Sequence, residues 1–133
     1  MDAREFREGE ELRVLVKEPI TKVQLLRYAG ASGDDNLIHV DSDTARAVGL
    51  DGVIAHGMLS MGFLGQYVAS LAGPAAVRRL RVRFSGMVRP GDVLTCRGVV
   101  KETRDGIAHL EVWAENQSGE RVTHGDAELL ARA

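Results

Sequence analysis

The sequence has little cysteine and no long apolar run. Cys96 is its one cysteine, so no disulfide can form within the chain and no cysteine-rich zinc site is possible. No segment approaches the roughly 18 apolar residues that a membrane-spanning helix needs. Residues 1–6 are charged and lack the apolar core of a signal peptide. We therefore expect a cytoplasmic protein that does not enter a membrane.

An excess of charge of one sign is also lacking. The chain has 17 Lys and Arg against 19 Asp and Glu, a net charge of −2, which gives no indication of a nucleic-acid partner. Its 133 residues match the size of one domain, and 44% hydrophobic residues are enough to build a core. No repeat or linker divides the sequence, so we expect a single domain over residues 1–133.

Alternating and capped patterns predict the first elements. Leu12, Val14 and Val16 alternate with polar residues, which predicts a strand within residues 11–20. Thr21 and Gln24 have the spacing of a capping box, which predicts a helix to about residue 31 that ends before Gly33. The apolar face of this helix would consist of Val23, Leu25 and Leu26.

A long apolar helix is the main element predicted for the middle of the chain. A polar break over residues 33–36 and a short helix over 42–48 come first. From His56 the sequence is then apolar on nearly every helix face as far as Gly73 and Pro74. A helix of this kind is expected to be buried rather than to lie on a surface.

The hydrophobic period changes to two after Pro74, which predicts antiparallel strands. They lie near residues 79–84, 93–101, 107–114 and 122–131. We therefore predict an α+β fold, a curved antiparallel sheet wrapped around the long central helix. A sheet of about five strands cannot cover a helix on all sides, so we expect a second subunit to complete its burial.

Asp34 and His39 lie five residues apart around the polar break. A carboxylate and an imidazole at this distance can hold one water molecule, remove its proton and return a proton, which is general acid–base chemistry. The alternative is structural: Asp34 caps a turn and His39 is a packed surface histidine. The pair alone does not decide between the two interpretations.

Gly57 stands where the long helix is predicted to begin. The first amides of a helix have no intrahelical acceptor, and they point outward with the positive end of the helix dipole. A glycine there lets a carbonyl oxygen approach the backbone closely and be polarised. The alternative is a glycine needed only for packing of the helix on the sheet.

Two segments carry a resemblance to a known family. Residues 31–39 read Ala-Ser-Gly-Asp-x-Asn-x-Ile-His, and residues 55–58 read Ala-His-Gly-Met. Together they resemble the MaoC-like (R)-specific hydratase/dehydratase family, which has the hot-dog fold. The resemblance implies a hydro-lyase that interconverts trans-2-enoyl and (3R)-hydroxyacyl thioesters of coenzyme A or acyl carrier protein. It implies no cofactor, and a homodimer or a heterodimer with a related hot-dog subunit.

The resemblance also implies roles for individual residues. Asp34 and His39 match the catalytic pair, Gly57 matches the amide that binds the thioester carbonyl, and Asn36 matches a residue that supports the pair. Leu37 stands where the family usually has proline, so the loop loses one fixed φ angle. Some relatives carry a serine in the central helix where this chain has Gly65, and that role is not carried over.

Four other functions compete with this one. Asp34, His39 and His56 have the residue types of a two-histidine, one-carboxylate metal site. His56 and Ser60 are four residues apart on one helix face, as in a nucleophilic pair. A hot-dog thioesterase would be expected to carry a carboxylate on the central helix, and residues 56–72 contain none. A subunit that binds acyl thioesters or a partner without turnover is the remaining possibility.

Overall fold

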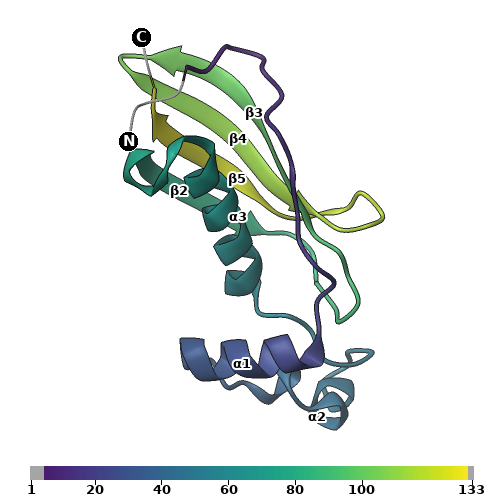
Figure 1. Ribbon diagram of the computed structural model, residues 1–133. Helices are drawn as coiled ribbons and strands as arrows, with labels where there is room; N and C mark the ends of the chain where they lie inside the picture. Colours follow the sequence, from purple (N-terminus) through teal and green to yellow (C-terminus); the bar gives the residue numbers. More distant parts are fainter. Residues whose placement is uncertain (1–4, 132–133) are drawn as a thin grey trace.

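A five-stranded antiparallel sheet with one long helix along its face dominates the structure, a computed structural model that describes residues 5–131 (Figure 1). In spatial order the strands are β1, β3, β4, β5 and β2, and every neighbouring pair is antiparallel. Their bounds are Leu15–Val16 for β1, Val77–Phe84 for β2, Thr95–Arg104 for β3, Ile107–Glu115 for β4 and Arg121–Leu130 for β5.

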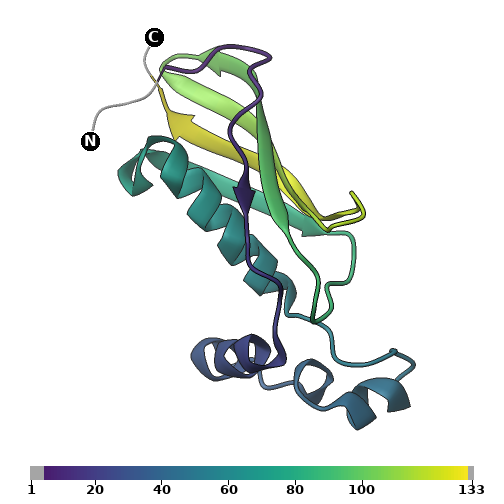
Figure 2. The same ribbon diagram turned by 45° about the vertical axis from the view of Figure 1, so that its right-hand side comes forward.

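The helices fall into two groups. α3 (Gly57–Ala72) packs on the sheet, and the 3₁₀ turn η2 (Pro74–Ala76) links it to β2. α1 (Lys22–Ser32), the 3₁₀ turn η1 (Leu37–His39) and α2 (Ser42–Ala47) lie together beyond the end of the sheet, next to the start of α3 (Figure 2). Within residues 5–131, no helix combines the length and the hydropathy needed to cross a membrane.

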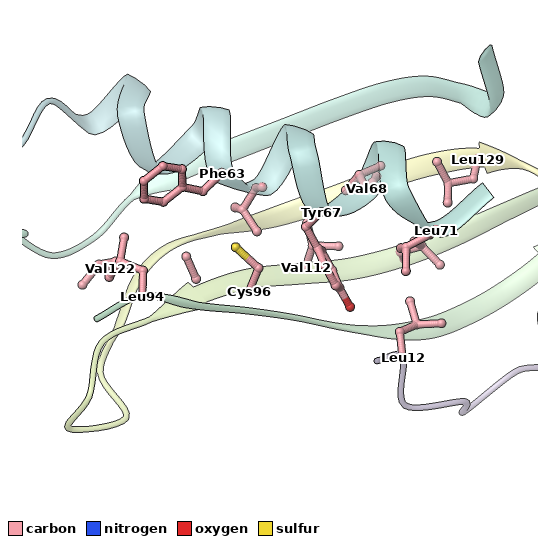
Figure 3. Packing of buried hydrophobic residues seen from close by; sticks show 14 of the residues in the cluster. Leu12, Phe63, Tyr67, Val68, Leu71, Leu94, Cys96, Val112, Val122 and Leu129 are labelled. Carbon is pink, nitrogen blue, oxygen red and sulfur yellow. The ribbon is translucent and has the colours of Figure 1, made fainter. Parts of the chain in front are cut away.

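The core lies between α3 and the sheet. Figure 3 shows Phe63, Tyr67 and Leu71 of α3 pointing toward the strands. Cys96 and Val112 meet them from β3 and β4, and both are fully buried. Burial raises the pKa of the Cys96 thiol to about 12, so the thiol stays protonated and inert at neutral pH. Each large side chain buried here contributes about 1.5–3 kcal/mol of hydrophobic stabilisation.

The predicted α+β architecture and the four later strands are confirmed, but the strand predicted within residues 11–20 is too long. Only Leu15–Val16 forms a regular strand, and Glu11 makes an isolated bridge to Val99. The rest of this segment still follows β3: the Leu12 N–H donates to the Gly98 carbonyl oxygen at 2.9 Å and the Lys17 N–H to the Leu94 carbonyl oxygen at 2.8 Å. Side chains add to these backbone bonds. The Arg13 guanidinium donates to the Ser70 carbonyl oxygen at 2.7 Å, and Lys17 Nζ donates to Gln66 Oε1 at 2.9 Å.

Two predictions about buried faces are wrong in part. In α1 only Leu25 of the predicted apolar face is buried, whereas Val23 and Leu26 are exposed. α3 is buried on its sheet side but not all round. One stripe of the helix is exposed, with residues four apart: Met58, Gly62, Gln66 and Ser70. The sheet of one chain therefore covers only part of this apolar helix.

Candidate functional site

A chain of short hydrogen bonds shapes the loop between α1 and η1. Gly33 ends α1 in the left-handed region at φ 76°, which a residue without Cβ adopts at no steric cost. The Asp34 N–H donates to Ser32 Oγ at 3.1 Å, and the Asn36 N–H donates to Asp34 Oδ1 at 3.3 Å. One carboxylate oxygen of Asp34 is thereby held by the backbone, and Oδ2 stays available.

Asn36 caps the turn that carries His39. Its Oδ1 accepts a hydrogen bond from the Ile38 N–H at 3.1 Å, and the His39 N–H donates to the Asn36 carbonyl oxygen at 3.1 Å. Leu37 is the exposed first residue of this turn. The side chain of Asn36 therefore orders the turn in which the family usually has proline. It bonds to the backbone rather than to the carboxylate or the imidazole.

The His39 ring is buried and oriented by one backbone carbonyl. Only 10% of its side chain is exposed, against 54% for Asp34. Nδ1 lies 2.8 Å from the Ile54 carbonyl oxygen, which can only accept, so Nδ1 carries the proton. Nε2 then faces Asp34 Oδ2 at 3.8 Å. His39 is therefore packed, as the structural interpretation expected, but buried rather than at the surface, and Asp34 does cap a turn by accepting from the Asn36 N–H.

His56 lies against the pair, and from the sequence it is a candidate only as a metal ligand or as a partner of Ser60. It is 2% exposed and occupies the N-cap position of α3. Its ring stacks on that of His39, with centroids 3.8 Å apart and an interplanar angle of 22°. Tyr28 of α1 also contacts the His56 ring in an edge arrangement, at 4.8 Å between centroids and an interplanar angle of 61°. These contacts join residues far apart in the chain, so no local sequence signal reports them.

Gly57 is the first residue of α3, as predicted. A Cβ atom at this position would lie 3.1 Å from the Phe84 ring, closer than an ordinary contact. The packing explanation for this glycine therefore has a physical basis. It does not compete with the amide explanation, because the Phe84 ring lies against the Cβ position of Gly57 whereas the proposed donor is its backbone N–H.

The stacked rings do not suit a metal ion. Asp34, His39 and His56 bring one possible ligand atom each within 4.8 Å of one another. The lone pairs of an imidazole lie in the plane of its ring, and these two planes are nearly parallel at 3.8 Å between centroids. In-plane lone pairs on such rings cannot converge on one ion. The donor set is thus present, but its geometry favours acid–base chemistry.

Ser60 is engaged away from His56. Its hydroxyl donates to the Gly57 carbonyl oxygen at 2.7 Å and lies 2.6 Å from Thr123 Oγ1, in a buried pair. His56 directs Nε2 to the Asp34 carbonyl oxygen at 3.0 Å. The two side chains therefore form no nucleophile–base pair, and that alternative is wrong.

A small apolar cavity of about 180 Å³ opens beside the His39 ring. Val23 and Leu26 of α1, which are not packed into the core, line this cavity. Sequence reasoning missed this role because it assigned them to a buried helix face. The cavity is lined by Lys22, Val23, Leu26, His39, Val40 and Val53.

Comparison with known sequences points to one family. A family model described as a MaoC like domain matches residues 5–122. A fatty acid synthase subunit beta of Aspergillus oryzae is 37% identical over 109 residues, which cover 79% of this chain but 5% of that protein. An (R)-specific enoyl-CoA hydratase of Rhodospirillum rubrum is 37% identical over 78 residues, covering 57% of this chain and 54% of that enzyme. The chain thus spans only part of these relatives.

Known structures show the same architecture. An R-hydratase of Pseudomonas aeruginosa superposes with a TM-score of 0.85 at 29% identity, over 95% of this chain and 82% of that one. An (R)-hydratase of A. caviae superposes with a TM-score of 0.86 at 24% identity, over 98% and 100% of the two chains. The hot-dog fold expected from the sequence is therefore confirmed.

Proposed function

Because the chain belongs to the MaoC-like domain family, we propose that it is a hydro-lyase. It interconverts trans-2-enoyl and (3R)-hydroxyacyl thioesters by syn addition or elimination of water. The observation that carries the proposal is the pair of proton acceptors, His39 Nε2 and Asp34 Oδ2, 3.8 Å apart beside an apolar cavity. Residues 1–133 act as one catalytic domain in this proposal, and the reaction takes place in the cytoplasm.

The spacing of the two acceptors suits one water molecule. A separation of 3.8 Å is too long for a direct hydrogen bond, but two bonds of about 2.8 Å to a shared water span it. Such a water donates one proton to each acceptor and keeps a lone pair for carbon 3 of the enoyl group. These two contacts are hydrogen bonds, and only one proton is transferred: as the oxygen bonds to carbon 3, one member of the pair takes that proton, the carbon 2–carbon 3 π bond breaks, and the pair delivers one proton to carbon 2 on the same face. The second water proton stays on the new hydroxyl group. The same groups reverse the steps in elimination.

The start of α3 takes the thioester carbonyl in this mechanism. Addition at carbon 3 moves negative charge to the carbonyl oxygen, and the Gly57 N–H with the helix dipole stabilises that charge. Asn36 supports the pair by ordering the turn that holds His39. The hydratase needs no metal or cofactor for these steps, since protons and one water account for every bond made and broken.

The acyl thioester is carried by coenzyme A or by acyl carrier protein, and the apolar cavity beside His39 supports an acyl chain as its occupant. A second hot-dog subunit, identical or related, is the proposed protein partner. A known structure similar to this chain, at 24% identity and a TM-score of 0.83, is titled a ChsH1-ChsH2 complex from Mycobacterium tuberculosis. Met58 on the first turn of α3 and Phe84 at the end of β2 support such a partner, because they are large apolar side chains that one chain leaves exposed.

The test is hydration of crotonyl, octenoyl and dodecenoyl thioesters by the purified chain, with the configuration at carbon 3 of the product determined. We expect the (3R) product. Asp34→Asn and His39→Gln should each lower kcat by about 10²–10⁴-fold because each removes a group that accepts a water proton. Asp35→Asn is the matched control, since it makes the same change one residue away in an exposed position.

The rival functions give different results in the same assay. A thioesterase releases free thiol and leaves the acyl double bond intact. A subunit without turnover gives no product alone or with Asp34 replaced. Wild-type activity in Asp34→Asn would rule out the catalytic role of the pair, and inactivity of the wild-type chain with all three thioesters would contradict the proposed function.

A further inference from the structure

His56 contacts several residues of the candidate site, yet it takes part in no step of the proposed mechanism. It contacts the backbone of Asp34, the ring of His39 and the ring of Tyr28. These three partners belong to a loop, to η1 and to α1, while His56 itself begins α3 next to Gly57. One buried ring thus touches every segment that supplies a reacting group.

The hydrogen bonds of His56 define its tautomer. Nε2 lies 3.0 Å from the Asp34 carbonyl oxygen, which only accepts, so Nε2 carries a proton. Nδ1 is buried and has no hydrogen-bond partner among residues 5–131. A second proton there would create a buried N–H without an acceptor, which is costly. His56 is therefore the neutral tautomer with its proton on Nε2.

Stacking gives this ring a second function. The Ile54 carbonyl fixes one edge of the His39 ring at Nδ1 but leaves the ring free to tilt about that contact. The His56 ring stacks on His39 at 3.8 Å between centroids, and Tyr28 in turn contacts the His56 ring edge-on. Rotation of His39 that would move Nε2 away from Asp34 Oδ2 requires the stack to open.

We infer that His56 is a positioning residue that sets the distance between His39 Nε2 and Asp34 Oδ2. Its N–H holds the backbone of one partner, and its ring holds the plane of the other. This inference rests on the proposed hydratase function, because the distance matters for a shared water. It assigns no contact between His56 and the substrate.

Two substitutions separate the two contacts. His56→Gln keeps an N–H near the position of Nε2 and removes the ring, whereas His56→Phe keeps the ring and removes the donor. We expect kcat to fall by about 10²-fold in each, with KM little changed, because a displaced catalytic group affects the transition state most. His109→Gln is the control, a half-exposed histidine on β4 far from the site.

Nuclear magnetic resonance tests the inference without activity. In the wild-type chain we expect ¹⁵N shifts of His56 for a neutral ring with protonated Nε2. The His39 ring protons should lose their upfield ring-current shift when the stacked ring is removed in His56→Gln and should keep an upfield shift in His56→Phe. A protonated Nδ1 on His56 in the wild type, or His39 signals that ignore both variants, would overturn the inference.

The outcomes also separate the two proposals. If the wild-type enzyme hydrates enoyl thioesters and both folded His56 variants keep its kcat, the positioning role is wrong and the hydratase function stands. If the wild type hydrates none of the thioesters, the hydratase function has failed. The His39 and His56 resonances then still decide whether His56 holds the pair.

Discussion

At the scale of single residues, the role of the Gly57 N–H can be separated from the role of its missing side chain. Gly57→Ala adds a Cβ atom next to the Phe84 ring but keeps the N–H. Gly57→Pro adds the same atom and removes the N–H. Proline is accepted at the first position of a helix, and His56, with φ −61° and ψ 135°, has the extended backbone that precedes proline.

We expect Gly57→Pro to lower kcat by about 10²–10³-fold relative to Gly57→Ala, because one oxyanion donor is worth that much. The Ala variant itself should lose less, since the Phe84 ring is 51% exposed and can shift by a few tenths of an ångström. Steady-state kinetics with crotonyl-CoA measures both. Equal kcat in the two variants would show that the glycine serves packing alone.

The sequence predicted the candidate pair and the helix start, but not the neighbours that orient them. Asp34, Asn36 and His39 lie on one short loop, so their proximity follows from chain connectivity alone. The contacts of His56 with the Asp34 carbonyl and of Gly57 with Phe84 join segments 22 and 27 residues apart in the chain. Such contacts depend on how the start of α3 packs against β2 on the one hand and against the loop of Asp34 on the other. Local sequence patterns do not encode this packing.

At the scale of secondary-structure elements, the pairing of β2 with β5 depends on one glycine. Gly125 lies opposite Val82 in this pair. A Cβ on Gly125 would meet the Arg81 carbonyl oxygen and lie 2.7 Å from Val82 Cα. Both are backbone atoms, so the strand itself would have to move. We expect Gly125→Ala to lower the free energy of unfolding by about 3 kcal/mol, at the upper end for overpacking.

Gly98 in β3 is the matched control for this substitution. A Cβ there would approach the Tyr67 hydroxyl at 3.1 Å and Leu12 Cδ1 at 3.3 Å, which are side-chain atoms that can adjust. We expect Gly98→Ala to cost about 1 kcal/mol. Denaturant unfolding at a fixed protein concentration measures both variants. A Gly125→Ala protein as stable as the Gly98→Ala protein would contradict this account of the β2–β5 pair.

Local sequence patterns predicted an element correctly where a capping or turn residue by itself marks the end of that element. The capping box at Thr21 and the left-handed Gly33 delimit α1 in the structure as in the sequence. The turn at Asp105 and Gly106, both with positive φ, closes the β3–β4 hairpin. The alternation of Leu12, Val14 and Val16 overstated the first strand, because Val14 and Val16 point to solvent and only Leu12 enters the core. An alternation of apolar and polar residues indicates a buried strand face only where another element of the fold packs on that face.

At the scale of the whole molecule, one chain leaves apolar surface and a sheet edge uncovered. β2 lies at one end of the strand order and, within residues 5–131, pairs only with β5. Phe84 at the end of β2 and Met58 on the first turn of α3 are both more than half exposed. Exposed strand edges and clustered apolar side chains are costly in water and are typical of subunit contacts.

We therefore expect the isolated chain to sediment with twice the 14.4 kDa mass of one chain. Placing a charge in this surface, as in Phe84→Lys, should weaken the dimer. Val48→Lys should not, because Val48 is also apolar and exposed but follows α2, away from the sheet (Figure 1). Since only association hides this surface, Tm of the wild type should rise with protein concentration while that of Phe84→Lys stays constant. A wild-type chain that remains monomeric, and becomes a dimer only when a related hot-dog subunit is added, would show that the surface fits a different partner and would contradict self-association.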